Sequence, residues 1–172
     1  LSRRTGVIYY DCTNYYFEIE KEDNLRRYGK SKEHRPNPIV QMGMFMDADG
    51  LPLAFCINPG NTNEQQTMQP LEEILANEFN LSEFVVCTDA GLASIDNRIY
   101  NTSESRNYVV TQSIPQLPKL MKEWAVDKTG WKRLGDQFDH TYDISDLNLN
   151  EEKNNLYYKE RWFKENRSNV KD

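Results

Sequence analysis

The chain has 172 residues, is 38% hydrophobic and 28% charged, and carries a formal net charge of −6 at pH 7. This composition is that of a globular protein with one sizeable core, and no apolar run approaches the roughly 20 residues that a membrane-spanning helix needs. The negative charge disfavours general nucleic-acid binding, so phosphate recognition would require local basic segments or a bound metal. The chain starts at Leu1 without an initiator Met, and we expect it to be a fragment of a longer protein.

The first third of the chain predicts three strands. Residues 6–20, rich in Tyr, Ile, Val and Phe, form the first of them. The polar segment 21–38 reads as a loop. Residues 39–58 then predict a hairpin of two strands, because the turn signal Asp49–Gly50 lies between two apolar runs.

Helices alternate with strands in the next segment. A helix over about 68–79 is predicted by an apolar stripe of Leu71, Ile74, Leu75 and Phe79. The other predicted elements are strands over 84–88 and 108–111 and helices over 93–100 and 117–126. The order β-β-β-α-β-α-β-α predicts an α/β fold, with a mixed sheet, right-handed crossovers and helices on its faces.

The character of the chain changes at about residue 127. The last 46 positions are polar and charged, yet they carry many aromatic side chains in weakly alternating segments that favour short strands. We therefore predict a core over residues 1–126 and a β-rich insertion subdomain, truncated, over residues 127–172.

The three cysteines, Cys12, Cys56 and Cys87, all lie in apolar, strand-like runs. An odd number of widely spaced cysteines without CxxC pairs argues against a disulfide framework and against a zinc site. Reduced thiols in a cytoplasmic protein are the better interpretation.

Two aspartates are the main candidates for function. Asp11 interrupts an apolar strand, and Asp89 follows the apolar run 84–88. Burying an unpaired carboxylate costs several kcal/mol, so a core aspartate is expected to be hydrogen-bonded, ion-paired or bound to a metal. If the first and fourth strands are neighbours, the two carboxylates converge and offer the ligands that Mg²⁺ or Mn²⁺ prefers, together with water and phosphate oxygens. Two such ions can catalyse an in-line phosphoryl transfer.

Structural roles compete with this interpretation. An aspartate at a strand end is commonly a turn former or a helix cap, and this alternative stays open for both residues. The other candidates receive structural interpretations: turn chemistry for Asp47 and Asp49, a solvated helix face for Glu72 and Glu73, and the surface for His34 and His140.

Four segments taken together carry a family likeness: Tyr10–Thr13, Met44–Leu53, Pro59–Glu64 and Val85–Gly91. In order and spacing they resemble the catalytic domain of bacterial insertion-sequence DDE transposases, in the cut-and-paste branch with a β-rich insertion before the last catalytic helix. The likeness covers residues 6 to about 125. It implies an RNase H-like fold, with the first two catalytic and metal-binding aspartates at Asp11 and Asp89 and two Mg²⁺ or Mn²⁺ ions in the complete site.

The resemblance also implies partners. Lys30, Lys32 and Arg35 match the basic stretch that such proteins carry between their first two strands and are candidate phosphate contacts, with a solvated loop as the alternative. The implied partner is double-stranded DNA, both transposon ends and target. The full-length protein is expected to be a homodimer in the bacterial cytoplasm.

The third acidic residue of this branch is a Glu in a Tyr-x-x-Arg-x-x-x-Glu pattern, which Tyr158, Arg161 and Glu165 fit in spacing. The surrounding segment is strand-like, however, so the third carboxylate is expected beyond residue 172, with Glu165 as the alternative. The fragment alone is then expected to be inactive. The leading prediction is metal-dependent DNA cleavage and strand transfer during transposition. The alternatives are a catalytically incomplete RNase H-like module that binds DNA or a partner, and a simple nuclease of the same fold.

Overall fold

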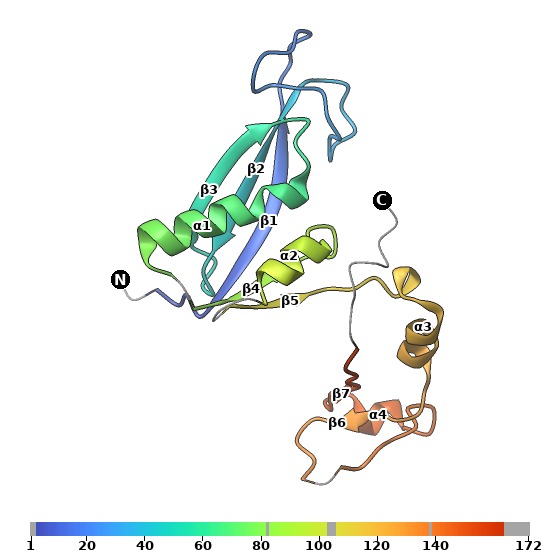
Figure 1. Cartoon of the computed structure of the whole chain (residues 1–172). Coiled ribbons are helices and arrows are strands. Elements are labelled where there is room, and N and C mark those ends of the chain that lie inside the picture. Colours follow the sequence, from blue (N-terminus) through green and yellow to red (C-terminus); the bar gives the residue numbers. More distant parts are fainter. Residues whose placement is uncertain (1–2, 82, 103–105, 138, 164–172) are drawn as a thin grey trace. The chain divides into compact units, whose positions relative to one another are not determined.

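The computed structural model describes residues 3–81, 83–102, 106–137 and 139–163 (Figure 1). The chain forms two compact units, Leu1–Gln112 and Ser113–Asp172. Within the described residues, no helix is long and apolar enough to cross a membrane.

The first unit is built on a five-stranded mixed sheet with the strand order β3-β2-β1-β4-β5. Its strands are β1 (Val7–Tyr16), β2 (Ile39–Met46), β3 (Pro52–Pro59), β4 (Val85–Thr88) and β5 (Asn107–Val110). The first three form an antiparallel meander, and β4 and β5 continue the sheet in parallel on the other side of β1. This is the RNase H-like topology, and it confirms the predicted α/β fold with a mixed sheet.

Helices α1 (Met68–Phe79) and α2 (Ile95–Tyr100) lie together on one face of this sheet, in front of it in Figure 1. A short 3₁₀ turn, η1 (Glu64–Gln66), precedes α1. Leu71 and Leu75 of the predicted stripe are buried, whereas Ile74 and Phe79 are exposed, so the buried stripe is narrower than the sequence predicts. The α1 helix ends at Asn80, whose positive φ of 53° suits the left-handed conformation that asparagine tolerates.

The hydrophobic core lies between these helices and the sheet. Alternation along β1 sends Ile8, Tyr10 and Cys12 into this core, where they meet Phe45 of β2 and Val86 of β4. The opposite face of the sheet carries the intervening residues. Among the described residues of this unit, no helix packs on that face, and several of its large apolar side chains are exposed: Tyr9, Tyr15, Phe55, Ile57 and Val109.

The second unit is small and contains short elements: η2 (Ile114–Gln116), α3 (Lys119–Val126), β6 (Lys132–Arg133), α4 (Leu149–Glu152) and β7 (Tyr157–Tyr158). Strands β6 and β7 pair antiparallel as a two-stranded sheet. The Lys159 ammonium lies over the rings of Trp124 and Trp131 and donates to the Asp127 carbonyl at 2.6 Å, which ties the segments together. The assignment of residues 1–126 to a catalytic core and 127–172 to an insertion stays a prediction, because compactness does not show which segments serve catalysis.

Candidate active site

Two parallel strands, β1 and β4, lead toward the candidate aspartates in a fixed register. Strand β1 pairs with β4 through Val7↔Val85, Ile8↔Val86 and Tyr9↔Cys87. The two members of each pair are 78 positions apart, and so are Asp11 and Asp89. The ladder ends at Tyr9↔Cys87, and the same offset extended by two residues would pair Asp11 with Asp89, which directly follows β4.

Both aspartates line one open cavity of about 600 Å³. The rest of its wall is largely apolar and includes Tyr9, Met46 and Val109 from the neighbouring strands. The structure thus brings the two predicted residues together, beside a space large enough for waters and a phosphate group. Their metal-binding and catalytic roles stay predictions.

Asp11 is exposed, so the expectation of a buried carboxylate at this position is wrong. Its neighbours Tyr10 and Cys12 point into the core, and alternation turns Asp11 to the opposite face of the sheet. The sequence was misleading because β1 is apolar or aromatic at nearly every position near Asp11, which hides the difference between its two faces. An exposed carboxylate has no desolvation cost to offset, so its presence in β1 does not by itself require a partner.

Each aspartate accepts one hydrogen bond from the backbone. Asp11 Oδ1 accepts from the N–H of Cys12 at 2.8 Å, and Asp89 Oδ1 accepts from the N–H of Leu92 at 3.1 Å. The second bond closes the turn that follows β4. Within the described part of the chain, the Oδ2 atoms accept no hydrogen bond, and since a carboxylate can accept about four, both groups retain capacity for a ligand.

One of the three predicted basic residues contacts β1 next to Asp11. The ammonium of Lys32 donates to the carbonyl of Cys12, next to Asp11 in β1, and the Lys32 N–H donates to Asn14 Oδ1 at 3.2 Å. Arg35 lies over the Tyr16 ring at 5.0 Å and pairs with Glu33. Lys30 is exposed.

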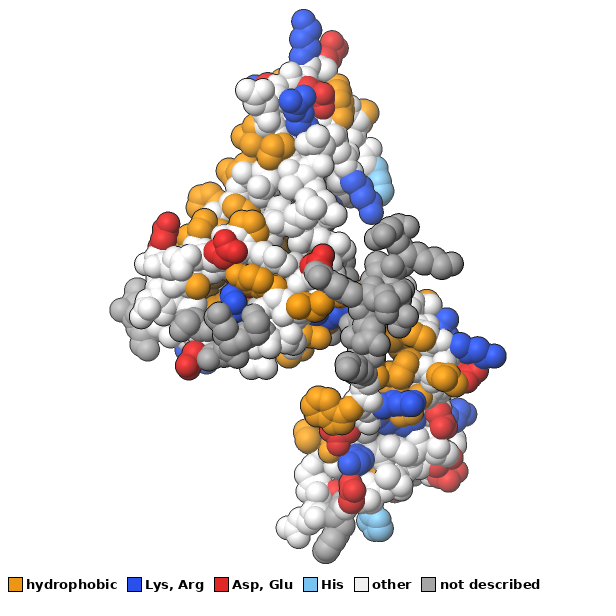
Figure 2. Space-filling view, in the orientation of Figure 1, with side chains coloured by type: hydrophobic (Ala, Val, Ile, Leu, Met, Phe, Trp, Pro, Cys, Tyr) orange, Lys and Arg blue, Asp and Glu red, His pale blue; other side chains and the backbone are white. Residues whose placement is uncertain are grey.

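The loop that carries these residues is not uniformly basic. Figure 2 shows Lys and Arg side chains next to acidic ones at the loop between β1 and β2, the top of the view. Arg26 pairs with Asp23, and Arg27 pairs with Glu22. A phosphate contact in this loop would therefore depend on individual residues such as Lys32, and DNA contact by all three stays a prediction.

Sequence reasoning missed Glu72, which is 0% exposed. The expectation of a solvated helix face is wrong for this residue and holds for the exposed Glu73. Burial raises the pKa of Glu72 to about 7, against the opposing effects of a 3.0 Å hydrogen bond from Asn101 Nδ2 and of the Arg106 charge. The periodicity of α1 could not reveal this environment, because it arises from α2 packing alongside.

Asp47, in the hairpin, behaves as predicted. Asp47 Oδ1 accepts from the N–H groups of Asp49 at 3.0 Å and Leu51 at 2.9 Å, and the Arg3 guanidinium lies 3.3 Å from Oδ2. The Leu51 N–H in particular holds the pKa of Asp47 below its usual range, against the effect of desolvation. These contacts confirm turn chemistry at Asp47.

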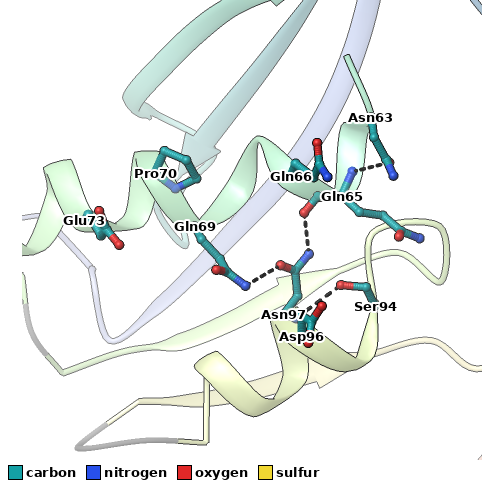
Figure 3. Close-up of a pocket in the computed structure, with 9 residues that line it drawn as sticks. All are labelled: Asn63, Gln65, Gln66, Gln69, Pro70, Glu73, Ser94, Asp96 and Asn97. Carbon is teal, nitrogen blue, oxygen red and sulfur yellow. Dashed lines mark hydrogen bonds between the residues drawn. The ribbon is translucent and has the colours of Figure 1, made fainter. Parts of the chain in front are cut away.

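A second cavity, of about 380 Å³, lies between the start of α1 and α2 and contains neither candidate aspartate (Figure 3). Amide side chains dominate its wall, among them Gln65, Gln69 and Asn97. Sequence reasoning assigned no role to these residues. The run of Asn and Gln residues over 61–69 was the available signal, but it has no helical or strand periodicity.

Within the described residues, no group of three or more His, Cys, Asp or Glu side chains is arranged to hold a metal ion. Glu165 lies outside those residues. Comparison with protein-family models, with curated proteins and with solved structures finds no match to this chain.

Proposed function

We propose that this chain carries the catalytic domain of a DDE transposase, which cleaves DNA at a transposon end and joins the freed 3′-OH to target DNA. The observation that carries the proposal is that Asp11 and Asp89 both line one cavity, beyond the end of the parallel β1–β4 pairing. The RNase H-like strand order supports it, because that fold is compatible with nucleotidyl transfer.

The donor set suits Mg²⁺ or Mn²⁺. Asp11 and Asp89 each keep one carboxylate oxygen without a hydrogen bond in the described structure, and the cavity leaves room for waters and phosphate oxygens. When bound, a pair of such ions would activate the attacking oxygen and stabilise the leaving one in an in-line displacement. The third carboxylate would come from Glu165 or from a residue beyond 172.

DNA is the proposed partner. Lys32 is the best placed of the three basic candidates, since its ammonium lies at the main chain next to Asp11. In this role Lys32 would contact the DNA phosphate nearest the carboxylates, while Lys30 and Arg35 would contact other phosphates of the DNA backbone. The full-length protein would act as a homodimer on two transposon ends.

Titration with Mn²⁺, followed by paramagnetic broadening of backbone amide signals, tests the metal site. We expect selective broadening of residues near Asp11 and Asp89 in the unmodified chain, and its loss in Asp11→Asn and in Asp89→Asn. Glu73→Gln is the matched control, since Glu73 is also an exposed carboxylate but lines the other cavity. Broadening that is absent, or that persists in both Asn variants, would contradict the proposal.

A second candidate function is a catalytically incomplete RNase H-like module that binds DNA or a partner. The observation in its favour is that both aspartates already accept backbone N–H bonds that shape the local chain. If their roles are only structural, Asp11→Ala and Asp89→Ala, which remove the acceptors of these bonds, will unfold at clearly lower urea concentrations. If they are metal ligands on an exposed face, the folded state will keep its stability or gain slightly when the charges are removed.

A further inference from the structure

The loop that carries Asp89 is held by two amide side chains from outside it. Gln65 Nε2 donates to the carbonyl of Gly91 at 3.0 Å, and Asn97 Nδ2 donates to the carbonyl of Leu92 at 2.8 Å. The N–H of Leu92 in turn donates to Asp89 Oδ1. Two consecutive carbonyls of the turn are therefore fixed by donors from η1 and α2, and the turn fixes the carboxylate.

Asn97 is fixed by its own hydrogen bonds. It is only 3% exposed, and its Nδ2 also donates to the Gln65 carbonyl at 2.9 Å. Its Oδ1 accepts from Gln69 Nε2 at 2.9 Å (Figure 3). Both protons of the amide and its oxygen are used, so the side chain has one favoured orientation.

Gln65 is placed by the turn before α1. Its N–H donates to Asn63 Oδ1 at 3.1 Å, and its carbonyl accepts from Asn97 (Figure 3). With the Gln65 backbone held at both ends, its side chain reaches from the amide-lined cavity to the Gly91 carbonyl. Figure 3 shows Asn97 bonded to the Gln69 side chain and to the main-chain carbonyl of Gln65.

This network explains how an exposed turn can hold a carboxylate in a defined direction. A turn that directly follows a short four-residue strand would otherwise open easily, since exposed loops have low local stability. The two donors act on the main chain of residues 91 and 92 and leave Asp89 Oδ2 without a hydrogen bond in the described structure. Preorganisation of a metal ligand by such supporting hydrogen bonds is what maintains affinity at metal sites.

We propose that Gln65 and Asn97 are positioning residues that hold the Asp89 turn in the geometry needed for divalent-metal binding. This role rests on the proposed function, since it takes Asp89 as a metal ligand. Neither residue lines the cavity beside Asp11 and Asp89. They act through the main chain of the turn.

The test compares Gln65→Ala with Gln66→Ala. Gln66 lines the same cavity and is exposed, but its side chain makes no hydrogen bond within the described residues, so it is a matched control. Two readouts are needed: amide hydrogen exchange of Leu92, and the Mn²⁺ concentration that half-broadens signals around Asp89. Gln65→Ala should speed Leu92 exchange roughly tenfold, as expected for a lost hydrogen bond, and raise the Mn²⁺ midpoint several-fold with little change in Tm. Asn97→Asp, which keeps the acceptor for Gln69 but loses the donors to the Leu92 and Gln65 carbonyls, should change both readouts more strongly and also lower Tm.

The outcomes separate this role from the function on which it rests. Equal Leu92 exchange in Gln65→Ala and Gln66→Ala overturns the positioning role whatever the metal does. Faster exchange with an unchanged Mn²⁺ midpoint overturns it too, because the network would then be merely structural. If the unmodified chain binds no Mn²⁺ while Gln65→Ala still speeds Leu92 exchange, the proposed function fails and the control of the Asp89 turn by Gln65 is upheld.

Discussion

The two faces of the sheet in the first unit are made by the same strands and differ in what lies on them. On one face Ile8, Tyr10 and Phe45 are buried beneath helices, while on the other Tyr9 and Asp11 are exposed. Asp11 lies between two buried neighbours along β1. Residues that stabilise the core therefore alternate with the candidate metal ligand in the same strand. Rigid burial on one face can therefore hold a carboxylate in place on the other without burying it.

The largest expected difference between the faces is in packing. Phe45 is 0% exposed and lies 4.6 Å from the Tyr10 ring, whereas Phe55 in the neighbouring strand is 60% exposed. Phe45→Ala should lower the free energy of unfolding by about 3–5 kcal/mol, and Phe55→Ala by less than about 1 kcal/mol. Urea unfolding of both variants measures this, and equal losses would show that the second face is also buried.

The buried Glu72 gives the next largest effect, and it depends on pH. Because burial raises its pKa to about 7 from an ordinary 4.5, the folded state holds a proton between these values that the unfolded state has released. Stability should therefore fall as pH rises from about 4.5 to 7 and stay lower above 7, by up to about 3 kcal/mol. Glu72→Gln should remove this dependence and the exposed Glu73→Gln should not. A pH profile of unfolding that is the same in both variants would contradict the burial of Glu72.

Asp47 and Asp11 allow a buried aspartate to be compared with an exposed one. Asp47→Ala should lower the urea midpoint, because it leaves the N–H groups of Asp49 and Leu51 without their acceptor. Since its pKa is lower in the folded state, Asp47 stabilises the fold above the ordinary value near 3.8, and this contribution is lost as pH falls through its folded pKa. Asp11→Ala, on the exposed face, should change the midpoint far less. A larger loss at Asp11 would make that residue structural.

The smallest expected effect is that of single lysine substitutions on DNA affinity. Lys32→Ala should weaken binding to a short duplex and reduce the salt dependence of log K by about one, as for one lost phosphate contact. Lys30→Ala should change both less, because the Lys32 ammonium is bonded to the Cys12 carbonyl next to Asp11, whereas Lys30 is exposed. Fluorescence anisotropy over a range of salt concentrations measures both. Equal effects of the two variants would contradict a specific phosphate contact by Lys32.

Much of the fold follows from local patterns in the sequence. The Asp49–Gly50 turn predicts the β2–β3 hairpin, and the spacing of Leu71 and Leu75 predicts α1. Once the element order is known, right-handed crossovers place β4 beside β1, and this predicts the proximity of Asp11 and Asp89.

The environment of individual side chains is much less predictable. Whether Asp11 is buried depends on which face of β1 receives a helix, and a strand that is apolar on both faces does not reveal this. Glu72 is buried by α2, and the Gln65–Asn97 network forms between segments about 30 residues apart in sequence. Such contacts leave no periodic signal, because they depend on how the elements pack.

The most direct test of the central claim is anomalous scattering from crystals of this chain soaked in Mn²⁺. The account predicts a peak between the carboxylates of Asp11 and Asp89 that disappears in Asp89→Asn crystals and persists in Glu73→Gln crystals. Carboxylates that lie far apart in well-ordered crystals, or a Mn²⁺ peak that avoids both, would contradict it.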